Sequence, residues 1–365
     1  MPPPPLADVR GVPERSAGCA SPVERPIAAV QRRVARCASI LPVRTGHLLR
    51  PYQIVMEERP DLTAADLGPD GILVRSEIGS VCGSDLSFYE GTDVAASYPF
   101  EPGCNLHESI GRVVASRSTR FAPGDRVLAL PRNRTGLADL YTTQADLAIP
   151  VPEGVPAGTL VLAQPLGTVL WGTRHAESMR DRDVVIIGAG AIGLLWTCVA
   201  RLHGARRIVV GDPIAHRLAV ARELGATETW QTGEDDALDV VRSATDGRLA
   251  DIVVEAVGHG QLGTTLDLAF WLVRRLGTIV SFGVPDEPRL TLDYGLFWRK
   301  NISLVPRNEP EVQRDFPAAL QLILDGHVPA ERFATHRFRI EDAPAAYDLA
   351  SRRADGVLKV QITFD

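Results

Sequence analysis

Residues 183–193 read DVVIIGAGAIG, a short apolar run that passes directly into three glycines spaced G-x-G-x-x-G. Such a run is typical of a strand buried on both faces of a parallel sheet, and the residues that follow have helical apolar spacing. The first glycine permits a tight turn, the second lets the backbone approach a pyrophosphate, and the third lets helix and strand pack closely. This context predicts a dinucleotide-binding βαβ unit. We expect the cofactor to contact Gly188, Gly190, Ile192 and Gly193.

The next apolar run, residues 207–210, is followed by Gly211 and Asp212. Asp212 lies 19 residues after Gly193, where a carboxylate accepts hydrogen bonds from the ribose hydroxyls. A carboxylate there repels a 2′-phosphate, so the sequence favours NAD over NADP. Arg217 is a further candidate contact and leaves NADP open, because its guanidinium could reach the same region.

The rest of the chain divides into two kinds of pattern. Residues 166–300 alternate apolar strands with helical segments, which predicts a doubly wound domain, and the α/β class for the chain. Residues 46–165 hold short strands punctuated by Gly and Pro, as in a small barrel-like domain. Residues 301–365 are mixed and end in a strand at 358–363, so we expect them to complete the barrel-like domain.

Residues 1–45 are rich in proline and arginine and contain no apolar signal segment. We interpret them as a flexible extension, which also argues against secretion. A helical stretch near residues 26–39 leaves open a transit peptide or a helix that docks on a partner.

Composition excludes several classes of function. Thirty-nine basic and 45 acidic residues give a net charge of −6, so no broad cationic face for nucleic acid is expected. No apolar run approaches the ~20 residues of a membrane span. The cysteines number five, odd and scattered, which indicates a reducing cytoplasm and free thiols or a metal ligand.

Two short motifs predict a metal site. Cys82 begins a Cys-Gly-Ser-Asp stretch, and His107 and Glu108 are adjacent at the start of another predicted strand. A thiolate, an imidazole and a carboxylate on short loops suit a tetrahedral zinc that keeps one position open. Each motif alone is weak, since a single cysteine is more often a small buried hydrophobe.

From about residue 48 to residue 365, these motifs in this order resemble the zinc-dependent medium-chain dehydrogenase/reductases. The resemblance implies a GroES-like β-barrel catalytic domain beside a Rossmann domain. It places the zinc at Cys82, His107 and Glu108, so Cys82 and His107 also count as catalytic. It implies that Ser84 receives the substrate's proton and that Asp85 holds the imidazole of His107 in one tautomer.

Parts of the sequence resemble two subgroups of that family in particular. Residues 80–91 are similar to aminocyclitol (scyllo-inosamine type) dehydrogenases, and residues 162–166 resemble glucose dehydrogenases. The resemblance to glucose dehydrogenases implies that Gln164 is a further metal ligand, at a position where most polyol dehydrogenases have a glutamate. It also implies that Asn308 lies near the nicotinamide and the sugar. A helix-capping role for Gln164, away from the metal, stays open.

The function that these resemblances imply is NAD-dependent oxidation of a secondary alcohol on a small polyhydroxylated substrate, namely a sugar, cyclitol or aminocyclitol. They also imply that the reaction belongs to secondary metabolism. The implied enzyme is a cytoplasmic homo-oligomer, a dimer or tetramer.

The chain also departs from the family pattern. Residues 124–127 and 136–139 lie within ten residues of each other with no cysteine between them, so no structural zinc is expected. Ser87 stands where many relatives have a relay histidine, and Cys104, three residues before His107, is a weaker candidate ligand. These departures keep an alternative open: a zinc-free reductase, or a nucleotide-binding member without alcohol dehydrogenase activity.

Overall fold

The computed structural model describes residues 43–365, apart from residues 94, 95, 175, 259, 286 and 308. The predicted extension up to residue 42 and the candidate cofactor contact Asn308 therefore lie outside the described residues. The described chain begins with strand β1 (Val43–Arg50), which pairs with β2 (Gln53–Arg59) in an antiparallel hairpin. Residues 43–45, the first of β1, thus belong to the segment that we assigned to the extension.

In the described residues, the second half of the chain forms a six-stranded parallel sheet of order β10-β9-β8-β11-β12-β13. Its strands are β8 (Asp183–Ile187), β9 (Arg207–Asp212), β10 (Glu228–Gln231), β11 (Ala250–Glu255), β12 (Val273–Ser281) and β13 (Ser303–Pro306). The predicted parallel sheet is confirmed. The predicted domain boundary at residue 300 falls before β13, because this half-exposed edge strand is short and carries little apolar signal.

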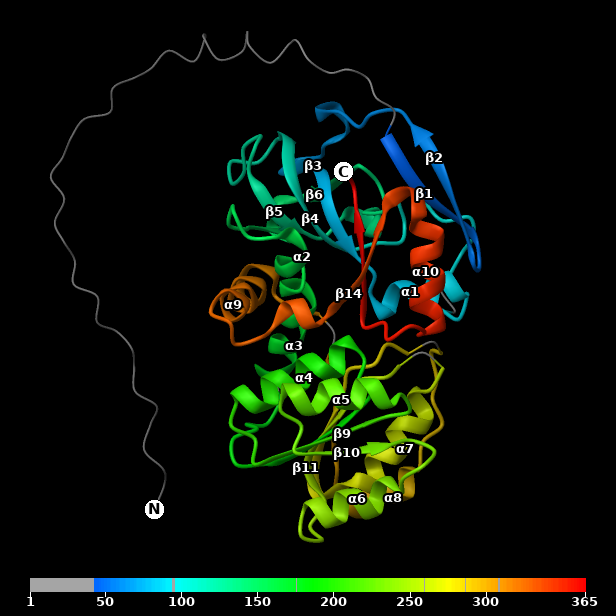
Figure 1. Cartoon of the computed structure of the whole chain (residues 1–365), viewed down its shortest axis with the longest axis vertical. Coiled ribbons are helices and arrows are strands. Elements are labelled where there is room, and N and C mark those ends of the chain that lie inside the picture. The colour runs from blue at the N-terminus through cyan, green and yellow to red at the C-terminus, as the bar shows by residue number, and fades with distance from the viewer. Residues whose placement is uncertain (1–42, 94–95, 175, 259, 286, 308) are drawn as a thin grey trace, which may run out of the picture. The chain divides into compact units, whose positions relative to one another are not determined.

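Helices cover both faces of this sheet. Figure 1 shows α4 (Ala191–Leu202) and α5 (Ala215–Leu224) on one side and α6 (Ala237–Ala244), α7 (Leu262–Leu272) and α8 (Tyr294–Lys300) on the other. Side chains of β8 alternate between the two faces. Val184 and Ile186 pack in the cluster that contains α4, whereas Val185 and Ile187 pack in the cluster that contains α7. The continuous apolar run therefore reflects burial on both sides, as expected for a doubly wound domain.

The barrel-like half is built on a second sheet, of order β14-β15-β3-β4-β5-β7, with β6 also pairing with β3. The strands are β3 (Gly71–Ser80), β4 (Glu108–Ser116), β5 (Arg126–Ala129), β6 (Leu140–Gln144), β7 (Ala148–Pro150), β14 (Ala334–Arg339) and β15 (Lys359–Thr363). The C-terminal strand β15 pairs antiparallel with the end of β3. The last residues of the chain therefore lie beside the residues that precede Cys82.

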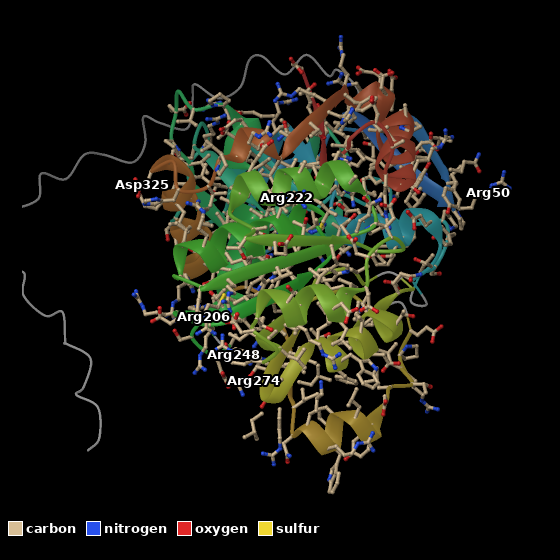
Figure 2. The ribbon with its side chains drawn as sticks, turned by 60° about the horizontal axis from the view of Figure 1, so that its bottom comes forward. Arg50, Arg206, Arg222, Arg248, Arg274 and Asp325 are labelled. Carbon is tan, nitrogen blue, oxygen red and sulfur yellow. The ribbon has the colours of Figure 1, made fainter. Side chains whose placement is uncertain are left out.

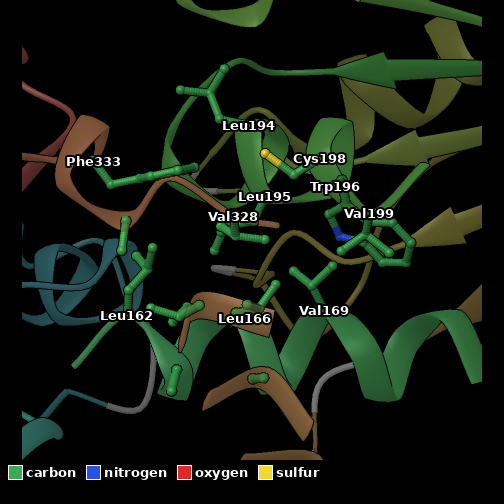
Figure 3. Close-up of a cluster of buried hydrophobic side chains, with 14 of the residues drawn as sticks. Leu162, Leu166, Val169, Leu194, Leu195, Trp196, Cys198, Val199, Val328 and Phe333 are labelled. Carbon is green, nitrogen blue, oxygen red and sulfur yellow. The ribbon is translucent and has the colours of Figure 1, made fainter. Parts of the chain in front are cut away.

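The α-helices described in the barrel-like half are α1 (Gly83–Glu90), α2 (Ala157–Leu160), α3 (Ala163–Arg174), α9 (Val312–Leu324) and α10 (Ala343–Arg352). Figure 3 shows where α3 meets α4: Leu166 and Val169 face Leu195 and Val199 in one buried cluster. Full burial of each such side chain contributes roughly 1.5–3 kcal/mol to the free energy of folding. Helix α3 also crosses the predicted boundary at residue 165, so the two halves share a core here.

Charged side chains gather at the amino ends of β8 and β11, at the edge opposite the glycine turn. Asp183 is buried and accepts hydrogen bonds from Arg206 Nε at 2.8 Å and from Arg248 Nη2 at 3.2 Å. Arg274 Nε donates to Asp251 Oδ1 at 2.7 Å. Figure 2 shows these three arginines near one another.

Among the described helices, none combines the length and apolarity that crossing a bilayer requires.

Candidate functional site

The predicted metal-ligating residues come together at the ends of two adjacent strands. Cys82 is the N-cap of α1, just after β3, while Glu108 opens β4 and pairs with Ser80 of β3. The ligand atoms of Cys82, His107 and Glu108 all lie within 4.8 Å of one another. In the described part of the chain this is the one such group of His, Cys, Asp or Glu. Its sulfur, nitrogen and oxygen donors match the ligand types that zinc takes in proteins.

Asp85 fixes two members of this group. Its buried carboxylate lies 2.8 Å from His107 Nδ1 through Oδ1, and it accepts a hydrogen bond from the Cys82 backbone N–H at 2.9 Å through Oδ2. A hydrogen on Nδ1 leaves Nε2 as the nitrogen that can bind a metal. Burial lowers the pKa of His107, but Asp85 and Cys82 outweigh it and raise that pKa to about 10.

Lys359 is a member of the site that sequence reasoning missed. Its Nζ lies 2.5 and 2.6 Å from the two carboxylate oxygens of Glu108 and donates to the Val81 carbonyl at 3.2 Å. Both side chains are buried. Burial lowers the pKa of Lys359, but Glu108, Cys82 and Asp85 together more than reverse this, so the net shift in pKa is upward. A signal existed: Lys359 is one of only two lysines in the chain and sits within an apolar strand.

Arg134 is the second member that was missed. It ends the 3-10 turn Arg132–Arg134, in the short connection where no structural-zinc lobe was expected. Its Nη2 donates to Ser84 Oγ at 2.5 Å and lies 3.1 Å from His107 Nδ1 and 3.5 Å from Asp85 Oδ1. Its guanidinium carbon lies 5.2 Å from the centre of the Phe88 ring. The local sequence carries no pattern that distinguishes this arginine from the many others.

Other candidate residues lie around this cluster. Ser87, at the relay-histidine position, is buried and donates its hydroxyl to the Ser84 carbonyl at 3.2 Å. Gln164 is buried in the first turn of α3, and among the described residues no hydrogen bond joins its side chain to Cys82, His107 or Glu108. Cys104 is not a member of the metal group, and burial raises the pKa of its thiol to about 12.

The glycine turn joins β8 to α4. Gly188 has φ +99°, in the left-handed region that favours glycine, and Gly190 is the N-cap of α4. A Cβ on Gly193 would lie 1.8 Å from the Gly188 carbonyl oxygen, so only glycine fits there. Ile192 lies in the first turn of α4 and is half-buried. The turn therefore presents backbone N–H groups at a helix N-terminus, where phosphates bind.

Asp212 and Arg217 also reach this turn. Asp212 is buried, and its carboxylate accepts hydrogen bonds from the N–H groups of Ala189 at 2.8 Å and Ile214 at 2.9 Å. Arg217 Nη1 lies 4.0 Å from Asp212 Oδ2, and Arg217 Nη2 donates to the Val357 carbonyl at 3.2 Å. Burial lowers the pKa of Arg217, and Asp212 partly opposes that shift. The structure thus brings all described cofactor candidates to one turn.

Comparison with known proteins adds independent evidence. The family model for the alcohol dehydrogenase GroES-like domain matches residues 68–200, and that for zinc-binding dehydrogenases matches residues 191–325. The chain is 27% identical to an alcohol dehydrogenase of Cupriavidus necator, over 88% of this chain and 98% of that protein. It is 25% identical to a sorbitol dehydrogenase of Rattus norvegicus, over 86% of this chain and 94% of that protein.

A solved structure agrees in fold. The alcohol dehydrogenase of Thermus sp. ATN1 superimposes with a TM-score of 0.77 at 25% identity, over 88% of this chain and 100% of that one. The GroES-like domain and the nucleotide-binding domain predicted from the motifs are therefore confirmed. The chain belongs to the zinc-dependent medium-chain dehydrogenase family, and its relatives named alcohol and sorbitol dehydrogenases are oxidoreductases that act on CH–OH groups.

Proposed function

We propose that this chain is a cytoplasmic, NAD-dependent, zinc-assisted dehydrogenase that interconverts a secondary alcohol and a ketone on a sugar, cyclitol or aminocyclitol, in secondary metabolism. The observation that carries the proposal is the approach of Cys82, His107 and Glu108 to within 4.8 Å, in a chain that also has a dinucleotide turn. Relatives named alcohol and sorbitol dehydrogenases support the reaction class.

In this proposal Cys82 and His107 hold one zinc, with Glu108 and Gln164 as the further ligands. Bound zinc would supply Lewis acidity that favours ionisation of the substrate hydroxyl. The Ser84 hydroxyl would accept the substrate's proton as it releases its own proton to solvent, and Asp85 would keep His107 in the tautomer that presents Nε2. Ser87 is buried and bonded to backbone, so in the described structure it offers Ser84 no evident relay to solvent.

For the cofactor we propose NAD. The N–H groups of the glycine turn face the pyrophosphate, and Asp212 disfavours a 2′-phosphate because both carry negative charge. Arg217 would line the same pocket. Asn308 lies outside the described residues and remains a candidate contact for the nicotinamide. The two domains align the substrate carbon with the nicotinamide and exclude water.

A second candidate function is supported by one observation, the pairing of both Glu108 oxygens with Lys359. A carboxylate that is already neutralised by an ammonium is stable without a metal. In a zinc-free reductase of the same family, or in a member that binds nucleotide without oxidising alcohols, this pair would be enough to keep the Glu108 carboxylate stably buried.

Metal analysis separates the two candidates. Protein expressed with added zinc, purified and analysed by atomic emission should contain one zinc per chain if it is the dehydrogenase, and none if it is the zinc-free member. The same preparation is then offered a panel of polyols, sugars, cyclitols and aminocyclitols with NAD, followed by NADH absorbance. One zinc per chain together with NADH formation on at least one compound supports the dehydrogenase.

A further inference from the structure

Arg134 is held at the candidate metal site by its backbone. The Leu106 N–H donates to the Arg134 carbonyl at 2.9 Å, and the Gly136 N–H donates to the Leu106 carbonyl at 3.0 Å. Leu106 directly precedes His107, so the turn that carries Arg134 is attached to the segment that carries the imidazole. Arg134 adopts φ +61°, which is uncommon for a residue with a side chain. Its position is therefore set by the fold rather than by a flexible loop.

The guanidinium uses only part of its hydrogen-bonding capacity. Nη2 makes the contacts to Ser84, His107 and Asp85, whereas Nε and Nη1 donate to no atom of the described residues. The Arg134 side chain is 31% exposed, while that of Asp85 is fully buried. The guanidinium carbon lies over the Phe88 ring, 5.2 Å from its centre, within the range of a cation–π contact. The arginine thus lies on the accessible side of the site with N–H groups available to a ligand.

The charges of the site also favour an anion. Glu108 is paired with Lys359, and Asp85 faces both His107 and Arg134. The two carboxylates and the two permanent cations therefore cancel. A bound zinc with Cys82 as its thiolate would leave one net positive charge on the accessible side. A neutral polyol gains nothing from this excess, an amine is repelled by it, and an oxyanion is attracted.

We infer that Arg134 recognises an oxyanion on the substrate, so that the enzyme acts on an acidic polyhydroxylated compound, a sugar acid or a sugar phosphate, in preference to a neutral or amino sugar. This inference rests on the proposed function and narrows its substrate class. Guanidinium pairs well with either oxyanion, because its planar N–H groups match both carboxylate and phosphate oxygens.

The test compares compounds that share a carbinol chain and differ in charge: glucitol, gluconate, glucitol 6-phosphate and 1-amino-1-deoxyglucitol. We expect kcat/KM with NAD to be highest for an anionic compound, and the better of gluconate and glucitol 6-phosphate identifies the oxyanion. Arg134→Gln should lower the ratio of anionic to neutral kcat/KM by roughly 10- to 100-fold, the usual worth of a charge-assisted hydrogen bond. Arg134→Lys should restore part of that ratio.

The matched control is Arg132→Gln, which removes an exposed arginine from the same turn and should leave the ratio unchanged. If neutral or amino compounds are oxidised as well as the anions, and Arg134→Gln does not change the ratio, the inference is wrong while the proposed function stands.

A binding measurement makes the inference testable without turnover. Calorimetric titration of the NADH-loaded, zinc-supplemented protein with malonate and with inorganic phosphate avoids the pyrophosphate site, which NADH fills. We expect binding of at least one anion to the wild type and to Arg132→Gln, and its loss in Arg134→Gln with unchanged circular dichroism. Equal binding by all three proteins would overturn the inference. Absence of zinc and of any NADH formation would instead overturn the proposed function.

Discussion

The metal cluster and the glycine turn are assembled in opposite ways. The glycine turn is almost contiguous: residues 183–193 form it, and Asp212, which braces it, is 23 residues from its partner Ala189. The metal cluster draws on segments far apart in the chain, and its Glu108–Lys359 pair joins residues 251 positions apart. The turn offers backbone N–H groups to a ligand, whereas the cluster is surrounded by the buried carboxylates of Asp85 and Glu108, which face the cations Arg134 and Lys359.

This difference teaches where each site is vulnerable. A site made of backbone N–H groups tolerates most side-chain changes but not an added Cβ at its close contacts. A site made of buried charges depends on every charge being paired, because an unpaired buried charge is costly. The four predictions below test that contrast, from the largest expected effect to the smallest.

The largest effect is expected for Cys82→Ala. Loss of the thiolate should remove the zinc, and with it several kcal/mol of transition-state stabilisation, so that activity falls by at least about a thousandfold. NADH binding, measured by fluorescence titration, should persist because the glycine turn is separate. The matched control is Cys104→Ala, which should keep both metal and activity. A metal-free Cys104→Ala protein would show that the ligand set is wrong.

A large loss of stability is expected for Lys359→Met. It leaves the Glu108 carboxylate buried without a cation, at a cost of about 3–5 kcal/mol in the free energy of unfolding of the metal-stripped protein. Urea denaturation measures this cost. The double variant Lys359→Met with Glu108→Gln should recover most of the loss, since no charge is then left unpaired. If the double variant is no more stable than the single one, the pairing is not what stabilises this region.

Gly193→Ala should destabilise the glycine turn, by less than Lys359→Met destabilises the metal cluster. The new Cβ meets the Gly188 carbonyl oxygen, so the turn must shift, at a cost of about 1–3 kcal/mol. NADH affinity should fall while zinc content stays unchanged. Gly190→Ala is the partner variant: a Cβ there meets nothing nearer than Arg217 Nη1 at 4.0 Å, so stability should hold while NADH binding weakens. Unchanged NADH binding in both would remove the turn from the cofactor site.

The smallest effect concerns the choice of nucleotide. We expect kcat/KM with NAD to exceed that with NADP by at least about tenfold, equivalent to roughly 1.4 kcal/mol. Asp212→Ala should narrow this ratio, mainly by weakening NAD binding, because it removes the carboxylate that we propose for the ribose and that accepts the Ala189 N–H within the turn. Asp212→Asn keeps the shape of the side chain and removes its charge, so it separates the effect of the charge on nucleotide choice from the effect of the side chain on the turn. Equal use of both nucleotides by the wild type would instead point to Arg217.

Much of the fold was predictable because its signals are local. Strand β8 lies in the apolar run that precedes the three glycines, helix α4 follows the glycine turn as the helical apolar spacing predicts, and the next apolar run begins β9. Edge strand β13 was missed, since a strand that is half-exposed needs no strong apolar pattern. The start of β1 was misjudged for a related reason: its pairing with β2 orders residues in a polar, arginine-rich stretch.

The sequence by itself predicted the glycine turn after β8, because a turn depends on residues a few positions away, and it named Cys82, His107 and Glu108 as candidate metal ligands, whose ligand atoms the structure brings within 4.8 Å of one another. Only the tertiary structure decided how these residues are charged and held. Pairing of β15 with β3 brings Lys359 to Glu108, and the bond between Leu106 and Arg134 brings a guanidinium to Ser84. Both contacts join distant segments, and electrostatic pairing leaves no periodic trace in a sequence. Neither Lys359 nor Arg134, the residue that we expect to select the substrate, could therefore be predicted without the folded structure.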